Sequence, residues 1–156
     1  MVLLLAHHGD AVAKDIDPER PLTPQGIADV KKMARFLAAA GICPARILHS
    51  DKVRARETAR LFRSQLAPDV ELEEVAGIRP DDAVAPFASQ VDNWQTDTLV
   101  AGHGPFMARL ISLLLAGPSQ PDSLVATRPG SVVALERNAA GGWSLAWMVR
   151  PELLGS

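Results

Sequence analysis

The first residues of the chain limit the choice of fold most strongly. Residues 2–6 form a continuous apolar run, which stops at the polar sequence His7-His8-Gly9-Asp10. A short apolar run that ends in polar residues is typical of a strand buried on both faces, and such strands occur in parallel sheets covered by helices. The sequence therefore predicts a buried first strand with a histidine-bearing loop directly after it.

A helix is predicted to follow this loop. Thr23 is a good N-cap residue, and Pro24 is favoured in the first turn of a helix. Apolar residues then recur at helical spacing until Gly41. The residues predicted to form the apolar face of this helix are Ile27, Val30, Ala34 and Leu37.

Strand-like and helix-like segments alternate along the rest of the chain. The further predicted strands are residues 45–49, 70–75 (a weak edge strand) and 97–101. The further predicted helices are residues 51–65, residues 81–91 and a segment that follows Pro105 and stops before Gly117. The last two strands, residues 131–136 and 143–149, flank a glycine-containing loop and predict a β-hairpin.

This order of elements predicts an α/β fold. Strands that alternate with helices favour a three-layer sandwich, in which a largely parallel central sheet carries helices on both faces. The final hairpin would add antiparallel strands at one edge. We expect a single domain that spans residues 1–156.

Composition excludes several classes of partner and site. The formal net charge is −2, without a strongly basic segment, so we expect neither nucleic acid nor a membrane surface as partner. The only cysteine, Cys43, rules out an internal disulfide and a cysteine-rich zinc site, and favours the cytoplasm. The apolar run at residues 2–6 is too short for a signal peptide or a membrane span. Without a heptad pattern, a monomer is expected.

Chemically capable residues follow the ends of three predicted strands. His8 follows the first strand, Arg54 lies at the start of the helix after the second, and His103 follows the strand at residues 97–101. In open α/β sheets, ligands bind at the carboxyl ends of the strands. These three side chains are therefore expected to converge on one site.

The motifs around these residues match a known pattern. The sequences A-H-H-G-D-A, R-P-L-T-P-Q-G, S-D-K-V-R-A-R-E-T and V-A-G-H-G-P occur in this order along the chain. In this respect the chain resembles the histidine phosphatase superfamily, which has the phosphoglycerate mutase-like fold. Its short length and the early R-P-L-T segment are most similar to the small SixA-type phosphohistidine phosphatases.

The resemblance implies catalytic roles for three residues. It makes His8 the nucleophile that accepts a phosphoryl group, with Arg54 and His103 holding the phosphoryl oxygens. These roles are chemically sound, because neutral imidazole is a good nucleophile and guanidinium can donate two aligned hydrogen bonds to an anion. His7, Arg20 and Ser50 are the further candidates for binding phosphate.

The chain departs from the family pattern at two positions. His7 stands where the family has an arginine, which should weaken phosphate binding. Gly77 stands where many members have a glutamate that donates a proton, so Asp81 or Asp82 would have to take that role. A phosphohistidine substrate needs such a donor less, since its nitrogen leaving group can take a proton from solvent.

Simpler roles remain for some of these residues. His103 could cap the helix that begins near Pro105, while Arg56, Arg60 and Arg63 are expected to be solvated charges on a helix. No metal-ligand spacing, G-x-S-x-G elbow or phosphate-binding P-loop is present in the sequence. Neither a metal nor another cofactor is therefore expected.

Two functions of different classes are consistent with these features. The first is a metal-independent phosphatase that acts through a covalent phosphohistidine, with a phosphorylated histidine-containing carrier protein as the favoured substrate and small phosphate esters next. The second is a non-catalytic phosphohistidine-binding or regulatory module, which the presence of His7 and the missing glutamate favour.

Overall fold

The computed structural model of the protein describes residues 1–119 and 123–155. The strands are β1 (Val2–His7), β2 (Arg46–His49), β3 (Leu72–Glu74), β4 (Thr98–Gly102), β5 (Val132–Arg137) and β6 (Trp143–Val149). The helices are α1 (Pro24–Ala39), α2 (Val53–Leu66), α3 (Ala85–Val91), α4 (Phe106–Ala116) and a short 3-10 helix, η1 (Pro151–Leu154).

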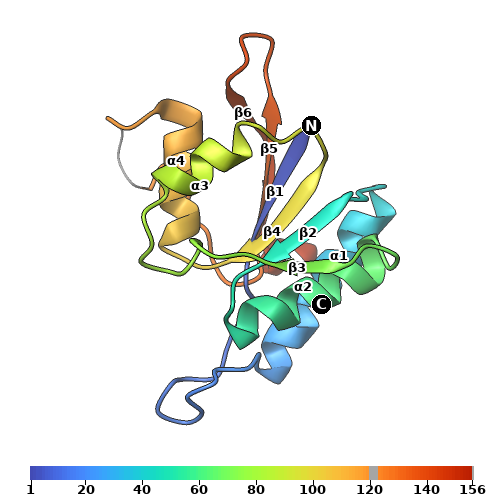
Figure 1. The fold of residues 1–156 in the computed structure, drawn as a ribbon. Helices are drawn as coiled ribbons and strands as arrows, with labels where there is room; N and C mark the ends of the chain where they lie inside the picture. The colour runs from blue at the N-terminus through green and yellow to red at the C-terminus, as the bar shows by residue number, and fades with distance from the viewer. Residues whose placement is uncertain (120–122, 156) are drawn as a thin grey trace.

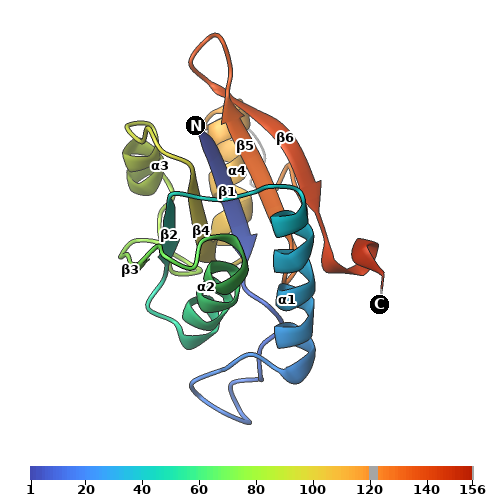
Figure 2. The same ribbon diagram turned by 90° about the vertical axis from the view of Figure 1, so that its right-hand side faces the viewer.

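The strands form one mixed sheet of six strands in the order β3-β2-β4-β1-β5-β6. The pairs β2–β3, β2–β4 and β1–β4 are parallel, whereas β5 pairs antiparallel with both β1 and β6. Helices α1 and α2 cover one face of the sheet, and α3 and α4 cover the other (Figures 1 and 2). The predicted three-layer α/β sandwich with a C-terminal hairpin is confirmed.

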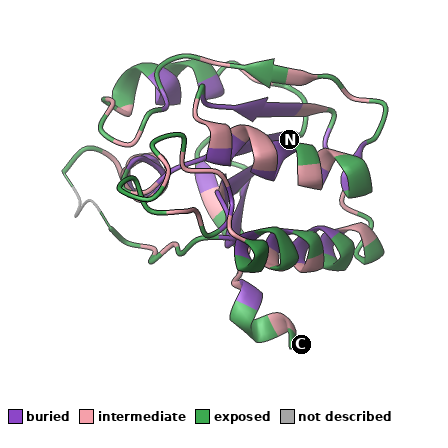
Figure 3. Ribbon diagram, turned by 90° about the horizontal axis from the view of Figure 1, so that it is seen from below, coloured by how far each residue is buried: buried purple, intermediate pink, exposed green. Residues whose placement is uncertain are grey.

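Each face of β1 contributes to a separate part of the core. Leu3 and Leu5 pack with residues of α3 and α4, whereas Leu4 and Ala6 pack with residues of α1 and α2. Successive side chains of a strand point to opposite faces, so a run that is apolar throughout can fill both layers. In Figure 3, buried residues accordingly follow the central strands, and the helices carry exposed residues along part of their surface.

The start of α3 was predicted wrongly. The helix begins at Ala85 and not at residue 81. The backbone N–H of Arg79 donates to the Asp82 carboxylate at 2.8 Å, which holds the preceding residues in a turn. An aspartate that binds nearby backbone in this way competes with helix formation.

The apolar face of α1 also differs from the prediction. Ile27 is 36% exposed, and the buried positions are Gly26, Val30, Met33, Ala34 and Leu37. Gly26 takes the place of a large apolar residue because the helix lies directly against the loop after β1. A Cβ atom at Gly26 would lie only 2.1 Å from the backbone oxygen of Asp10.

The N-cap of α1 was predicted correctly. The Thr23 hydroxyl accepts a hydrogen bond from the backbone N–H of Gly26 at 2.9 Å and donates one to the Asp10 carboxylate at 2.7 Å. These bonds join the start of the helix to the histidine-bearing loop. Within the described ranges, none of the helices has the length and apolar character needed to span a bilayer.

We predict that Gly26→Ala destabilises the protein by about 2 kcal/mol or more, because a rigid backbone cannot yield to the added methyl group. The free energy of unfolding in urea measures this effect. Gly142→Ala is the matched control, since the nearest atom to a Cβ there is a side-chain nitrogen of Asn138 at 3.4 Å. Equal stability of the two variants would contradict the close approach of α1 to the loop.

Candidate active site

The ends of three neighbouring strands bring the predicted site residues together. In the sheet, His7 of β1 pairs with Gly102 of β4, and His49 of β2 pairs with Ala101 of β4. The residues that follow these strands therefore emerge at the same edge. The backbone N–H of His8 donates to the Gly102 carbonyl at 2.9 Å, so the hydrogen bonding between β1 and β4 continues into the loop after β1.

The loop that follows β1 holds the imidazole of His8 in one tautomer. Its Nδ1 lies 2.6 Å from the carbonyl oxygen of Gly9. A carbonyl can only accept a hydrogen bond, so Nδ1 carries the ring proton and Nε2 keeps its lone pair. Burial lowers the pKa of His8 to about 3, which keeps the ring neutral at pH 7.

Arg54 lies against the free nitrogen of His8. The side chain is only 8% exposed, and its Nε donates to His8 Nε2 at 3.3 Å. Burial, followed by the nearby charge of Arg20, lowers the pKa of Arg54. Arg54 thus places a positive charge within reach of any phosphoryl group bonded to that nitrogen.

Thr58 positions the loop and was missed by the sequence analysis. Its hydroxyl accepts from the backbone N–H of Gly9 at 3.0 Å and donates to the Arg54 carbonyl at 2.8 Å. A signal for this role existed in the sequence, because Thr58 lies four residues after Arg54 and therefore on the same side of α2.

His103 lies near His8 and is fully buried. The centroids of the two rings are 5.1 Å apart. Its Nε2 lies 2.6 Å from the Ser50 hydroxyl, and the side chain makes no capping bond to α4. The interpretation of the His103 side chain as a helix cap is therefore wrong, while the expected convergence with His8 is found.

His7 lies beside His8, with ring centroids 4.9 Å apart. A Cβ atom at Gly104 would lie 3.2 Å from its Cε1, so the imidazole packs against the turn that leads into α4. Burial lowers the pKa of His7 to about 4, with the charge of Arg54 as the smaller cause. At neutral pH His7 therefore supplies no positive charge where the family arginine would.

A hollow of about 370 Å³ opens next to Arg54. The residues that line it are Lys14, Pro18, Glu19, Arg20, Asp51, Lys52, Val53 and Arg54. Arg20 has the uncommon backbone angle φ of 49°, and its Nε donates to the Val12 carbonyl at 3.0 Å. This arrangement brings Arg20 to the same hollow as Arg54, at the N-terminus of α2, where free backbone N–H groups favour anions.

The remaining arginines of α2 differ from one another. Only Arg60 is exposed, as predicted for a solvated charge. Arg56 and Arg63 are half-buried, and the Nε of Arg63 donates to the Val70 carbonyl. The prediction that Arg56 and Arg63 are simply solvated is wrong, and for Arg63 the reason is that the chain after α2 folds back against its side chain.

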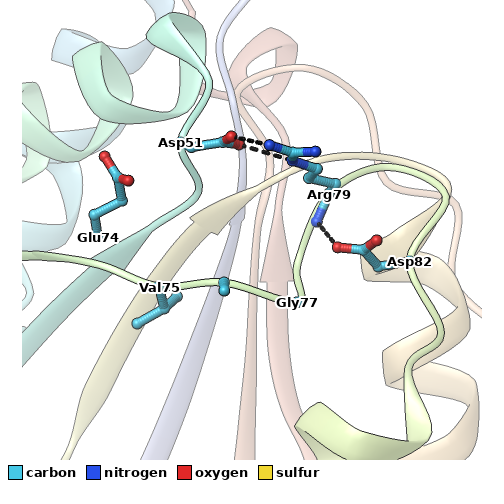
Figure 4. Close-up of a pocket in the computed structure, with 7 residues that line it drawn as sticks. Asp51, Glu74, Val75, Gly77, Arg79 and Asp82 are labelled. Atoms are coloured by element: carbon cyan, nitrogen blue, oxygen red, sulfur yellow. Dashed lines mark hydrogen bonds and ion pairs between the residues drawn. The ribbon is translucent and has the colours of Figure 1, made fainter.

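A second hollow adjoins the first, and Asp51 lines both. Figure 4 shows Asp51 in a bidentate ion pair with Arg79, while Asp82 accepts from the Arg79 backbone and Glu74 stands apart. Arg79 holds the pKa of Asp51 below its usual range. Asp82 is thus engaged in a turn, so a general-acid role for Asp81 or Asp82 stays a prediction that gains no support here.

No group of three or more histidine, cysteine, aspartate or glutamate side chains that could hold a metal ion is found in the described part of the chain. The site consists instead of neutral imidazoles and guanidinium groups. Such a set can donate to an anion and can offer one imidazole lone pair as a nucleophile.

Neutral imidazoles and guanidinium groups at the strand ends of an α/β sandwich are suited to holding a phosphoryl group. The family model of the histidine phosphatase superfamily (branch 1) matches residues 3–79. Over these residues the chain matches the histidine phosphatase superfamily, as its motifs indicated.

Solved structures agree with this assignment at the level of fold. The protein histidine phosphatase SixA in complex with tungstate superposes with a TM-score of 0.86 at 23% identity, over 99% of each chain. A candidate SixA phosphohistidine phosphatase of Agrobacterium tumefaciens gives a TM-score of 0.76 at 18% identity, over 96% of this chain and 97% of that one.

One curated relative matches part of the sequence. An uncharacterized chloroplastic protein of Arabidopsis thaliana is 37% identical over 67 residues, which is 41% of this chain. The match spans 31% of the relative's length. It therefore carries no inference about the activity of the whole protein.

We predict that acid destabilises the fold through the neutral histidines of the site. The pKa values of His7 and His8 are lowered to about 4 and about 3 from an ordinary value of 6.5. The unfolded chain therefore binds more protons than the folded chain below about pH 6.5, and stability falls with decreasing pH from there towards the folded pKa values. At pH 5 the loss is about 2 kcal/mol for each such histidine.

Urea unfolding at pH 7.5 and pH 5.0, in buffers without phosphate, measures this loss. His7→Gln removes one of the titrating groups, so its stability should fall by about 2 kcal/mol less than that of the wild type over the same interval. An identical pH dependence in both proteins would show that His7 is not held neutral by the fold.

Proposed function

We propose that the protein is a metal-independent phosphatase in which His8 Nε2 accepts the phosphoryl group. The hydrogen bond from His8 Nδ1 to the Gly9 carbonyl, at 2.6 Å, is the observation that carries this proposal. It directs the lone pair of Nε2 towards Arg54, where an anionic phosphoryl group would be stabilised. An imidazole in this form needs no further base to act as a nucleophile.

The reaction would proceed in two displacements. In the first, Nε2 bonds to phosphorus while the bond from phosphorus to the leaving group breaks, and the leaving group takes the electron pair. In the second, water attacks the phosphohistidine, inorganic phosphate is released and the lone pair returns to Nε2. Arg54, Arg20 and the N-terminus of α2 would neutralise the phosphoryl oxygens in both steps.

A phosphorylated protein histidine is the substrate we favour, with a histidine-containing carrier protein as its natural form and small phosphate esters as the next candidates. The support is chemical. Asp51 and Asp82 are both bonded to Arg79, so neither is free to protonate a leaving group. A nitrogen leaving group can take its proton from solvent.

The single thiol of the chain, Cys43, is exposed. It supports the further proposal that the protein works in a reducing compartment such as the cytoplasm.

A non-catalytic phosphohistidine-binding module is the second candidate. The neutral His7 favours it, because the phosphoryl pocket lacks the additional positive charge of the family arginine. Such a module would bind the phosphorylated carrier without releasing phosphate.

We predict that the purified protein releases phosphate from a phosphorylated histidine-containing carrier protein in the presence of chelator, and that His8→Ala abolishes this release. The reason is that no other side chain would carry the phosphoryl group. Acid-labile labelling of the wild type, absent from His8→Ala, would identify the intermediate. An aryl phosphate provides a second substrate with an oxygen leaving group.

Circular dichroism and urea unfolding of His8→Ala show whether the fold is retained. Turnover by the folded variant would refute the mechanism. Saturable binding of the phosphorylated carrier by the wild type without any phosphate release would favour the binding module.

We predict that His7→Arg increases kcat/KM about tenfold, equivalent to about 1.4 kcal/mol of transition-state stabilisation. At pH 7 the imidazole of His7 is neutral, whereas guanidinium remains charged and can form two bonds to phosphoryl oxygens. His7→Gln is the matched control, because it leaves the charge of the site unchanged at this pH.

Steady-state kinetics and vanadate affinity at pH 6 and pH 8 test this prediction. The gain should be larger at pH 8, because a bound dianion can still raise the pKa of His7 and recover part of the missing charge at lower pH. A destabilised His7→Arg protein with no gain in vanadate affinity would show that position 7 does not reach the phosphoryl group.

A further inference from the structure

Ser50 and His103 form a short, buried side-chain contact in the candidate site. Their Oγ and Nε2 atoms lie 2.6 Å apart, and the two residues are 1% and 0% exposed. Ser50 follows β2 and His103 follows β4, so the contact joins the ends of two paired strands. A contact this short between two buried polar groups is a hydrogen bond that solvent cannot replace.

The direction of this bond decides which ring nitrogen of His103 carries the proton. If the Ser50 hydroxyl donates, Nε2 is the acceptor and the proton resides on Nδ1. If Nε2 donates, the proton resides there and Nδ1 is a bare lone pair. A neutral imidazole has one donor and one acceptor nitrogen, so these two arrangements exclude each other.

Two observations favour donation by Ser50. The backbone N–H of Lys52 donates to the Ser50 hydroxyl at 3.3 Å, so the oxygen already has an acceptor role and its own proton is free to go to His103. The Nδ1 of His103 is buried and has no partner among the described residues. A bare lone pair there would repel a phosphoryl oxygen, whereas an N–H would bind it.

We propose that Ser50 is a positioning residue that sets the tautomer of His103: its hydroxyl donates to Nε2 and so places the ring proton on Nδ1, the nitrogen that donates to the phosphoryl group. Of the two nitrogens, Nε2 is occupied by Ser50, and only Nδ1 remains for a ligand. The inference deepens the proposed function and rests on it for the identity of the ligand.

This role differs from the phosphate contact expected for Ser50 from the sequence. The hydroxyl proton is directed to His103, so Ser50 acts on the phosphoryl group through the imidazole. His8 and His103 then have the same tautomer, but a different ring nitrogen faces the phosphoryl group in each. In His8 the proton on Nδ1 is held by a carbonyl and leaves Nε2 as nucleophile, whereas in His103 the proton on Nδ1 serves as the donor.

The tautomers can be read directly by two-dimensional ¹⁵N–¹H NMR of histidine-labelled protein at pH 7. The chain has 4 histidines, and the spectrum of His103→Asn identifies the signals of His103 by their loss. We expect both His8 and His103 to be protonated on Nδ1 in the wild type. In Ser50→Ala, the signals of His103 should move towards the other tautomer or towards a mixture, while those of His8 remain as an internal control.

Vanadate binding and kcat/KM supply a second readout. Ser50→Ala should weaken vanadate binding and lower kcat/KM about tenfold or more, because a wrong tautomer removes one donor from the site. His103→Asn should retain more affinity than His103→Gln, since the asparagine nitrogen lies near the position of Nδ1 and the glutamine nitrogen near that of Nε2. Ser64→Ala, an exposed serine of α2, is the matched control.

These outcomes separate the inference from the proposed function. A wild-type His103 protonated on Nε2 would overturn the inference, as would a Ser50→Ala protein with unchanged His103 signals. Absence of phosphate release from every substrate would overturn the proposed function alone, because the NMR spectrum and vanadate affinity do not depend on turnover.

Discussion

The parallel pairing of β1, β4 and β2 brings the residues of the candidate site together. Their register places His7 opposite Gly102, and His49 opposite Ala101, so the three strands end at one level of the sheet. Parallel strands all present their carboxyl ends at the same edge, and residues from distant parts of the chain meet there. The buried apolar strands that enforce this pairing thereby also create the site.

Burial then determines the electrostatic character of the site. His7, His8 and His103 are withdrawn from solvent, which keeps all three imidazoles neutral near pH 7. Positive charge comes instead from Arg54 and Arg20, whose guanidinium groups stay ionised. The site thus combines uncharged imidazoles with nearby guanidinium groups, an arrangement suited to a dianionic phosphoryl group.

Sequence patterns predicted those parts of the fold that depend on local features, such as the spacing of apolar residues and helix capping. The apolar run of β1 and the Thr23 cap of α1 are examples, because each depends on neighbours within a few positions. The prediction was wrong where a contact between residues far apart in the sequence decides which side chains are buried. Ile27 was expected in the core, but the approach of α1 to the loop at Asp10 requires Gly26 at the interface and turns Ile27 outwards.

The order of residues along the chain predicted which side chains follow the strand ends, and therefore that His8, Arg54 and His103 converge. The hydrogen bonds of their nitrogen atoms depend on the folded protein. Ser50 and His103 are 53 positions apart, and Arg54 and His8 are 46 apart, yet hydrogen bonds between them set the available lone pairs and donors. A difference of a few tenths of an ångström in distance, or a change in direction, decides whether a hydrogen bond forms. The spacing of residues along the chain does not give the distance between atoms of separate strands and helices.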